Sequence, residues 1–417
     1  MKGDLSLLRE RDFLLFFLAR TSSLTGNVIA PLGLAFAVLA LPDGSPSQLG
    51  LLLGTRTVAQ LGLILLGGVL ADRFPRRRLI IVGETVAGCS QALTAAVFLH
   101  GSVPMNLLIV LAAVNGASSA VSQPAATAII PQLVDAERIQ PANALLRLAA
   151  NLSRIGGVFT GGVLIAAVAP GWALAADAAT YFFSAVLLMF SRPRTLPRAL
   201  TATEAPPTSF LSELRSGWTE FSSLRWMWPV VSQFAVVNAS FGGAIMVLGP
   251  VVAEQELGGA VAWSVVLAAH SAGFVLGSLI AIRIRPRYPL RTGVFVTFGF
   301  FPAYVFLAAG SPTWLIATSM LAAGICIDVF EVLWRTTVHT HVPEHAMSRI
   351  SSYDSLVSFI CTPLGLAVAG PVAAHIGIAE TLLLSGVLVL LASTIPLFFS
   401  AVRTLPARST LPEHVPG

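Results

Sequence analysis

Long apolar runs separated by short turns constrain this chain more than any other feature of its sequence. Twelve runs have the length that a helix needs to cross roughly 30 Å of hydrocarbon. They cover residues 13–41, 49–71, 79–100, 104–130, 142–168, 171–191, 226–253, 261–284, 291–310, 313–341, 350–374 and 378–402. Because 55% of the 417 residues are hydrophobic and 11% are charged, we predict an all-α membrane protein with twelve transmembrane helices.

The basic residues lie on one side of the predicted spans. Arginines occur before the first span and after each even-numbered span, whereas the loops between carry no Lys or Arg. Basic residues in short loops are retained on the cytoplasmic side, so both termini are predicted in the cytoplasm. We therefore expect a multi-pass protein of the inner membrane. This topology explains the net charge of +5 without a nucleic-acid partner.

The rhythm of short loops breaks once, in a stretch rich in proline at 192–222. A shift of about 210 residues brings Asn27 onto Asn238 and Arg138 onto Arg349, which indicates an internal repeat. Two six-helix bundles related by a parallel repeat are typical of transporters whose substrate path runs between the halves. The expected domains are an N-terminal bundle at 1–191, a cytoplasmic linker at 192–222, a C-terminal bundle at 223–402 and a cytoplasmic tail at 403–417.

The tenth span holds the richest set of ionisable residues. Asp328, Glu331 and Arg335 lie at i, i+3 and i+7 and therefore share one face of a helix. Asp328 lies roughly 22 Å from the outer end of that helix at 1.5 Å per residue, near the middle of the membrane. One interpretation is that Glu331 and Arg335 neutralise each other. We hypothesise that Asp328, with Glu331 second, binds the coupling proton.

Further polar residues inside the spans are candidates for the lining of a central cavity: Arg20, Asn27, Arg56, Asn238 and Arg335. Asn27 and Asn238 occupy matching positions in the two halves, which favours hydrogen bonds at a shared cavity. The alternative for Arg20 is that its side chain extends to the cytoplasmic surface. Glu84 is expected to pair with nearby arginines, and Asp177 and Glu380 are expected to be solvated near the outer rim.

The turn after the second span is unusually charged for this chain. Residues 68–78 read Gly-Val-Leu-Ala-Asp-Arg-Phe-Pro-Arg-Arg-Arg. This resembles the signature Gly-x-Leu-Ala-Asp-Arg-x-Gly-Arg-Arg of the major facilitator superfamily, with Pro75 at the second glycine. The resemblance covers nearly the whole chain and includes residues 123–146 and 342–371. Within the superfamily, the chain is similar to proton-dependent drug exporters, a branch that includes macrolide and siderophore efflux pumps.

The resemblance implies a cytoplasmic gate at this turn. The gate candidates are Gly68, Asp72, Arg73, Arg76 and Arg77. Gly68 would let two helices approach closely, and Asp72 could meet the arginines or the N-terminus of another helix, which the resemblance identifies as the eleventh. The alternative is that the arginines only fix topology. The matching position in the second half is Ala281, so the gate is expected to be asymmetric.

Small residues and prolines indicate where helices pack closely or bend. Residues 156–162 resemble the antiporter motif Gly-Pro-x-x-Gly-Gly, with Val158 in place of the proline. Gly157 and Gly161 in this segment are helix-packing candidates. Pro363 and Gly365 in the eleventh span offer a comparable irregularity.

The remaining motifs argue against other function classes. The sequence has no phosphate-binding Gly-x-x-x-x-Gly-Lys-Ser/Thr loop, so ATP is not expected to drive the protein directly. His339, His341 and His345 are interrupted by Pro343, and no metal or cofactor is expected. We predict a monomer that is not an enzyme and whose partners are the lipid bilayer, protons and an amphipathic small molecule.

The sequence therefore predicts a secondary transporter that exports amphipathic small molecules by alternating access and is coupled to proton entry. Two alternatives stay open. The same fold could serve an importer or uniporter of a small metabolite, because fold does not fix direction. A membrane-embedded enzyme or scaffold is the other alternative, although no nucleophile–base pair supports it.

Overall fold

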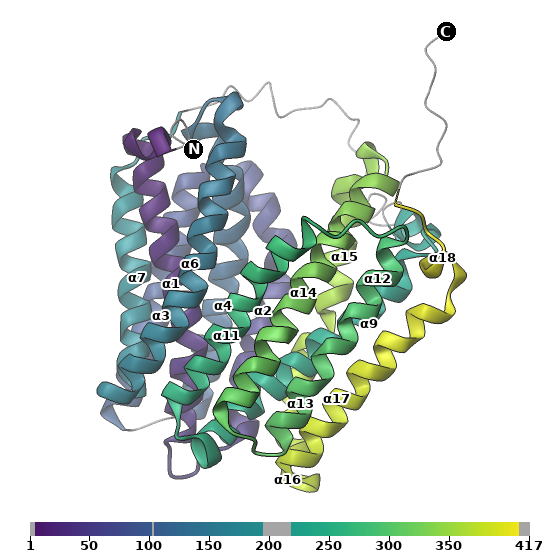
Figure 1. Cartoon of the computed structure of the whole chain (residues 1–417). Helices are drawn as coiled ribbons and strands as arrows, with labels where there is room; N and C mark the ends of the chain where they lie inside the picture. The colour runs from purple at the N-terminus through teal and green to yellow at the C-terminus, as the bar shows by residue number, and fades with distance from the viewer. Residues whose placement is uncertain (1–4, 102–103, 195–217, 408–417) are drawn as a thin grey trace. The chain divides into compact units, whose positions relative to one another are not determined.

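The computed structural model describes residues 5–101, 104–194 and 218–407 (Figure 1). Within these ranges the side chains of a few residues are not described, namely Leu5, Leu65, Val69, Asp72, Glu344, His345, Ser348 and Arg349. Most of the expected linker at 192–222 and the end of the expected tail at 403–417 lie outside the described residues. The described chain consists of helices and turns, without a β-strand.

Long helices occupy all six spans predicted in the first half of the chain. They are α1 (Arg11–Leu39), α2 (Pro46–Arg73), α3 (Arg76–His100), α4 (Met105–Ala128), α6 (Ile139–Ala167) and α7 (Pro170–Phe190). Shorter pieces are η1 (Leu5–Arg9), α5 (Ile130–Leu133) and η2 (Ala136–Arg138). Helix α2 begins with a capping box in which Ser45 and Gln48 each bond the backbone N–H of the other, and Pro46 follows in its first turn. Both features favour a helix start at this residue.

The spans of the second half are interrupted more often. They consist of α9 (Met227–Phe241), η4 (Gly242–Leu248), α10 (Gly249–Val252), η5 (Ala253–Leu257), α11 (Ala260–Ala281), α12 (Pro289–Val296), η6 (Thr297–Phe300), α13 (Phe301–Ala308), α14 (Thr313–His341), α15 (Glu344–Ile360), α16 (Thr362–Ile376), α17 (Ile378–Thr394), η7 (Ile395–Phe398) and α18 (Ser400–Arg403). The prolines explain several breaks because they cannot donate a helical hydrogen bond. Pro302 follows η6, Pro396 lies in η7, and Pro363 follows the break between α15 and α16 at Cys361.

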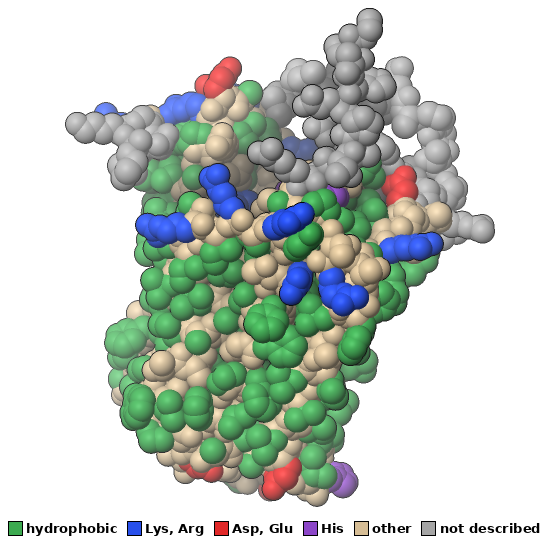
Figure 2. Space-filling model, turned by 45° about the vertical axis from the view of Figure 1, so that its right-hand side comes forward, with side chains coloured by type: hydrophobic (Ala, Val, Ile, Leu, Met, Phe, Trp, Pro, Cys, Tyr) green, Lys and Arg blue, Asp and Glu red, His purple; other side chains and the backbone are tan. Residues whose placement is uncertain are grey.

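Length and composition support the expected membrane layout. Eleven helical stretches in the described part of the chain are long and apolar enough to cross a membrane. Helix α2, with 28 residues, occupies the remaining predicted span. Figure 2 shows Lys and Arg side chains near the top of the face in view, above a broad hydrophobic surface. Exposed side chains such as Phe183, Leu279 and Leu391 suit contact with lipid rather than water.

Contacts divide the chain into two compact units. Unit 1 comprises Met1–Glu204, Gly242–Ala268 and Pro363–Ile378, and unit 2 comprises Ala205–Phe241, Ala269–Thr362 and Ala379–Gly417. Unit 1 therefore holds the helices of the first half together with parts of three spans from the second. The domain boundaries expected from the sequence stay a prediction.

In unit 1, α1 packs against α6 and α7, α2 against α4, and α3 against α4 and α7. Glycines set the closest approach of α2 and α4, because a Cβ atom on Gly67 would clash with the carbonyl oxygen of Ala120. A Cβ atom on Gly68 would meet no described atom within 4 Å. One residue turns the helix by about 100°, so Gly68 points away from this contact. In this structure the close contact between α2 and α4 therefore depends on Gly67, and the role of Gly68 in a gate stays a prediction.

In unit 2, α14 packs against α12 and α13, and α9 packs against α15. Aromatic rings fill the space between α9 and α14, where Phe234 and Phe330 stack with ring centroids 4.2 Å apart. Helices α11 and α14 also approach closely, because a Cβ atom on Gly324 would clash with the carbonyl oxygen of His270. Small residues thus allow close helix contacts in both units.

Candidate transport site

A polar stripe on α1 faces the interior of unit 1. Arg20, Ser23 and Asn27 lie at i, i+3 and i+7 and so share one side of the helix. The buried Ser23 hydroxyl donates to Oε1 of Glu84 on α3 at 3.2 Å. The Asn27 side chain donates to the carbonyl oxygen of Ser23 at 2.8 Å. Helix α1 therefore turns its polar side chains toward neighbouring helices.

Arg56 on α2 joins this stripe to two further helices. Its Nε donates to Oδ1 of Asn115 on α4 at 2.9 Å, and its Nη2 donates to Oδ1 of Asn27 at 3.1 Å. The Tyr181 hydroxyl of α7 donates to the same Asn27 oxygen at 2.9 Å. The structure thus brings Asn27 and Arg56 into one network. Sequence reasoning did not foresee that the arginine beside Asn115 comes from α2, because only the fold brings these helices together.

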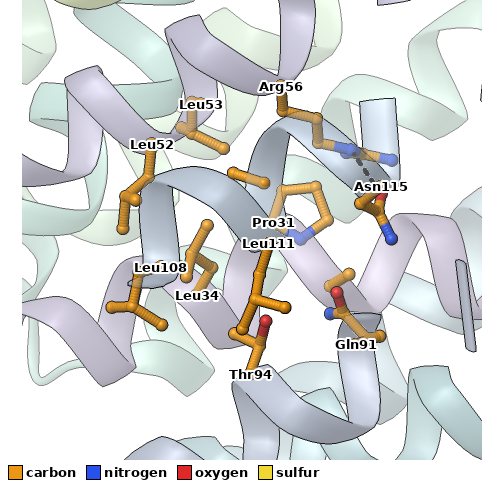
Figure 3. Close-up of a pocket in the computed structure, with 12 residues that line it drawn as sticks. Pro31, Leu34, Leu52, Leu53, Arg56, Gln91, Thr94, Leu108, Leu111 and Asn115 are labelled. Carbon is orange, nitrogen blue, oxygen red and sulfur yellow. Dashed lines mark hydrogen bonds between the residues drawn. The ribbon is translucent and has the colours of Figure 1, made fainter. Parts of the chain in front are cut away.

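A pocket lies beside Arg56 in unit 1 (Figure 3). Its lining consists of Ala30, Pro31, Leu34, Leu52, Leu53, Arg56, Gln91, Thr94, Leu108, Leu111, Ala112 and Asn115. Five leucine side chains from α1, α2 and α4 line it, and Arg56 and Asn115 lie together on one side of it. Apolar walls with a few polar groups at one end are typical of small-molecule sites.

Two acidic side chains are buried in unit 1, contrary to the sequence expectation for one of them. Asp177 on α7 is 1% exposed, and Glu84 on α3 is 4% exposed. The expected solvated position of Asp177 is wrong, because the face of α7 that carries it packs against α1 at Gly26. A Cβ atom on Gly26 would clash with Oδ1 of Asp177. Within the described residues, Oδ1 and Oδ2 of Asp177 and Oε2 of Glu84 have no hydrogen-bond partner. Glu380 is exposed, as predicted.

The arginines after the second span bind backbone oxygens at the ends of other helices. Arg76 donates to the carbonyl oxygen of Ala128, the last residue of α4, at 2.6 Å. Arg77 donates to those of Leu188 and Met189 near the end of α7 at 2.7 and 2.5 Å. A positive charge is favourable at a helix C-terminus, so these contacts hold α4 and α7 to the start of α3.

The contacts of Arg76 and Arg77 decide whether these arginines can pair with Glu84. Because Arg76 and Arg77 are engaged elsewhere, the expected pairing of Glu84 with the nearby arginines is wrong. The charge of Arg20 on α1 acts on Glu84 instead. Arg73 is exposed at the end of α2, and the side chain of Asp72 lies outside the described residues.

The acidic residues of α14, Asp328 and Glu331, both contact polar or charged side chains within unit 2. The Ser278 hydroxyl of α11 donates to Oδ2 of the half-buried Asp328 at 2.6 Å. Arg335 pairs with Glu331 one turn away, and their side chains are 63% and 42% exposed. The structure therefore favours the interpretation in which Glu331 and Arg335 neutralise each other.

The remaining candidates take part in helix contacts. Asn238 on α9 donates to the carbonyl oxygen of Ser358 on α15 at 2.9 Å. Gly157 and Gly161 of α6 face α1, where added Cβ atoms would lie 3.1 Å from the Thr25 carbonyl oxygen and 3.4 Å from the Ile29 and Leu32 side chains, respectively. In unit 1 the Gly365 carbonyl oxygen would lie 2.6 Å from a Cβ atom on Gly243. Pro363 follows the break between α15 and α16.

Sequence reasoning missed two ionisable residues within unit 2. His270 on α11 stacks on Phe241 with ring centroids 5.4 Å apart, and its Nδ1 lies 3.1 Å from the Met320 carbonyl oxygen. Asp354 on α15 accepts a hydrogen bond from Nε1 of Trp334 at 3.0 Å. Both lie inside predicted spans, and an ionisable residue in a span was the signal that could have found them.

The histidines at the end of α14 do not assemble a recognisable metal site in the part of the chain that the structure describes. Nδ1 of His341 lies 3.1 Å from the Thr337 carbonyl oxygen, His339 is exposed, and the side chain of His345 is not described. Among the described residues, no group of three or more His, Cys, Asp or Glu side chains could hold a metal ion.

Comparison with known proteins identifies relatives of this chain among membrane transporters. The profile of a family described as "Transmembrane secretion effector", a part of the major facilitator superfamily, matches residues 2–415. The enterobactin exporter EntS of Escherichia coli O127:H6 is 27% identical over 407 residues, covering 93% of each chain. The multidrug efflux pump Tap of Mycolicibacterium fortuitum is 24% identical over 420 residues, covering 96% of this chain and 98% of Tap.

Solved structures share the fold at low sequence identity. The nucleoside transporter NupG is 12% identical with a TM-score of 0.75, covering 93% of this chain and 98% of NupG. A D-xylose–proton symporter is 15% identical with a TM-score of 0.68, covering 96% of this chain and 98% of the symporter. These likenesses confirm the predicted fold class of twelve helices in two bundles. The chain belongs to the transmembrane secretion effector family of the major facilitator superfamily.

Proposed function

We propose that this chain exports amphipathic small molecules across the inner membrane by alternating access, coupled to proton entry. The observation that carries the proposal is the pocket of unit 1, which combines leucine walls with the Arg56–Asn115 pair. The names of two relatives, an enterobactin exporter and a multidrug efflux pump, support the outward direction.

The pocket encloses about 30 Å³ in this structure, so the chemistry of its lining, rather than its volume, supports binding of a molecule with one apolar part and one polar part when the pocket widens during transport. Leu34, Leu52 and Leu108 offer apolar surface, which favours burial of a hydrophobic group. The guanidinium of Arg56 is a donor that cannot lose its charge in a protein, so it favours a hydrogen-bond acceptor or an anionic group on the substrate. A fully apolar molecule would remove water from Arg56 without replacing its hydrogen bonds, which is unfavourable.

The turn after α2 is proposed to close the cytoplasmic side of the transport path. In this proposal Asp72 meets the start of the eleventh span, and Gly68 and Arg73 complete the motif around it. Arg76 and Arg77 tie α3 to the ends of α4 and α7, which supports movement of these helices as one rigid body. A gate that moves in this way can switch between two discrete arrangements.

The second unit is proposed to contribute a proton-binding carboxyl group at Asp328. Glu331 is the second candidate, but Arg335 already occupies its carboxylate. The Asp328 carboxylate accepts a hydrogen bond from the Ser278 hydroxyl of a neighbouring helix. Protonation of Asp328 is proposed to accompany one half of the transport cycle.

A resistance panel in a bacterial host without its own major efflux pumps tests this function. Cells that produce the wild-type protein should tolerate higher concentrations of some amphipathic antibiotics and dyes and accumulate less of them. Asp72→Asn should lose this resistance and Asp328→Asn should weaken it, while the protein level in the membrane stays the same. Addition of a protonophore should abolish the difference between wild-type and empty cells.

The same panel separates export from the alternatives. An importer would raise the cellular content of a compound and sensitise the host to it. A compound recovered in a chemically altered form would indicate an enzyme. Unchanged resistance and unchanged accumulation for every compound, with the protein in the membrane, would overturn the proposed function.

A further inference from the structure

The buried acid of α7 belongs to a second polar stripe that the transport proposal does not use. Asp177, Tyr181 and Ser184 lie at i, i+4 and i+7, so they share one face of α7. All three side chains are buried. Asp177 and Ser184 are separated by about 10 Å along the helix axis. This stripe runs opposite the α1 stripe, because α1 and α7 pack against each other.

Hydrogen bonds connect the α7 stripe to Glu84 on α3. The Tyr181 hydroxyl donates to the side-chain oxygen of Asn27, and Asn27 donates to the backbone of Ser23. The Ser23 hydroxyl then donates to Glu84. Ser184, the C-terminal member of the α7 stripe, also acts on the Glu84 carboxyl group. Polar groups therefore continue from the neighbourhood of Asp177 to Glu84.

The charged groups around Asp177 come from three helices. Arg56 of α2 and Glu84 of α3 act on it electrostatically, and Tyr181 is the titratable neighbour on its own helix. Helix α1 contributes Arg20, whose charge acts on Glu84. Helix α6, which also packs against α7, carries its arginines at 147 and 154 on exposed positions.

The two arginines do not neutralise the two acids by direct contact. No ion pair within 4 Å joins Arg20 or Arg56 to Glu84 or Asp177 among the described residues. Arg56 instead donates hydrogen bonds to the side-chain oxygens of Asn27 and Asn115. A carboxylate that is buried without a hydrogen-bond partner is strongly disfavoured, whereas the neutral carboxylic acid is tolerated. The surroundings of Asp177 therefore suit a carboxyl group that carries a proton.

We propose that Asp177 and Glu84 are two proton-binding sites of a relay inside unit 1, and that the coupling proton of the transporter passes between them. The inference rests on the proposed proton-coupled transport and adds the residues that move the proton. Asp177 releases a proton from its carboxyl group, and the Glu84 carboxylate takes up a proton, so that the number of protons on the pair is unchanged. No electron is transferred, and the charge of the pair is unchanged by the step.

Arg56 links this relay to the pocket, because it contacts the network and lines the pocket wall. When Asp177 loses its proton, the new negative charge attracts the guanidinium of Arg56. The position of Arg56 beside the pocket then depends on the protonation state of Asp177, and so does the affinity of the pocket for the transported molecule. This competition for one arginine is a coupling between two sites in the thermodynamic sense.

Infrared difference spectroscopy on the purified full chain in lipid tests the relay without a transported compound. A protonated carboxyl group has a C=O stretching band that a carboxylate lacks, so a step to higher pH should remove such a band from the wild type. Asp177→Asn and Glu84→Gln should each reduce the band by the share of one carboxyl group. Each variant should also move the pH at which the remaining band disappears. The exposed Asp135, which pairs with Arg194, provides the control Asp135→Asn with a wild-type band.

The outcome separates the relay from the proposed function. A band of wild-type size in both Asp177→Asn and Glu84→Gln would overturn the relay, and so would two losses without any mutual shift in pH. Failure of the resistance panel would overturn the proposed function and leave this spectrum unchanged. If a variant does not fold, dicyclohexylcarbodiimide labelling of the wild type replaces it, because this reagent modifies protonated carboxyl groups in apolar surroundings. Mass spectrometry should then find the label on Asp177 or Glu84, and a label on neither would overturn the relay.

Discussion

The buried acids of unit 1 and the acids of α14 in unit 2 have opposite surroundings. Asp177 is 1% exposed and its carboxylate oxygens have no hydrogen-bond partner among the described residues, while the charged groups acting on it come from other helices. Glu331 is 42% exposed and is neutralised by Arg335 one turn away. Neutralisation within one helix fixes a charge, whereas groups supplied by several helices can change partners when the helices move. The comparison therefore identifies unit 1 as the better place for a proton that must come and go.

The largest expected effect is that of Asp177→Asn. Asparagine cannot release a proton, so proton-driven export should fall by at least about tenfold, within the range of typical coupling energies. The measurement is the resistance of the efflux-deficient host at equal protein level, with Asp135→Asn as the control on an exposed acid. Wild-type resistance in Asp177→Asn would mean that the buried acid has only a structural role. The different surroundings of the acids in the two units would then have no consequence for transport.

Arg56→Gln should have the next largest effect, on both stability and transport. The change withdraws donors from the side-chain oxygens of Asn27 and Asn115, and a buried polar group without a partner costs about 1–3 kcal/mol. We expect a lower melting temperature in detergent and weaker export. Arg147→Gln is the matched control, because Arg147 is exposed on α6. A lower melting temperature with full export would show that Arg56 supports the fold but does not touch the transported molecule.

Gly26→Ala tests whether the close contact of α1 and α7 is what buries Asp177. The added methyl group would clash with the side chains of Thr180 and Asp177, and such overpacking costs about 1–3 kcal/mol. The melting temperature should fall and export should fall with it. Gly156→Ala is the matched control on α6, because a Cβ atom at Gly156 meets no described atom within 4 Å. Equal melting temperatures for the two variants would contradict the packing of Asp177 against α1.

Asp328→Asn should have the smallest effect of the four. The Ser278 hydroxyl can still donate to the side-chain oxygen of the new asparagine, so the contact between α11 and α14 is retained. We expect initial export rates reduced about threefold, because a coupling term below 1 kcal/mol is lost. The rate is measured beside Asp177→Asn in the same host. A loss of export rate as large as that of Asp177→Asn would show that the acid of unit 2 is as important for proton coupling as the buried acids of unit 1.

The overall fold was predictable from the sequence because the signals for it are local. Apolar runs, proline-containing turns and arginines on alternate loops each depend on a few neighbouring residues. The ion pair of Glu331 and Arg335 was also accessible, since residues four apart meet on any helix. These features required no knowledge of which helices pack together.

The site in unit 1 was only partly predictable, because it depends on contacts between distant helices. The distance of Asp177 from the end of its span suggested a solvated position, but the face of α7 that it occupies decides its burial. The spacing of Asp177, Tyr181 and Ser184 was a missed signal, since it matches the spacing of polar residues on α1. Arg56 and Asn115 lie far apart in the sequence, so only the packing of α2 on α4 reveals their pairing.

Transport by everted membrane vesicles tests the central claim, proton-coupled export through the buried acids of unit 1, most directly. The compound with the largest resistance shift is added to vesicles with an acidic interior, and its uptake is compared with its exchange at equal pH on both sides. The wild type should accumulate the compound until nigericin collapses the pH difference. Asp177→Asn should exchange the compound at the wild-type rate without responding to the pH difference. Accumulation by Asp177→Asn at the wild-type level would contradict the account.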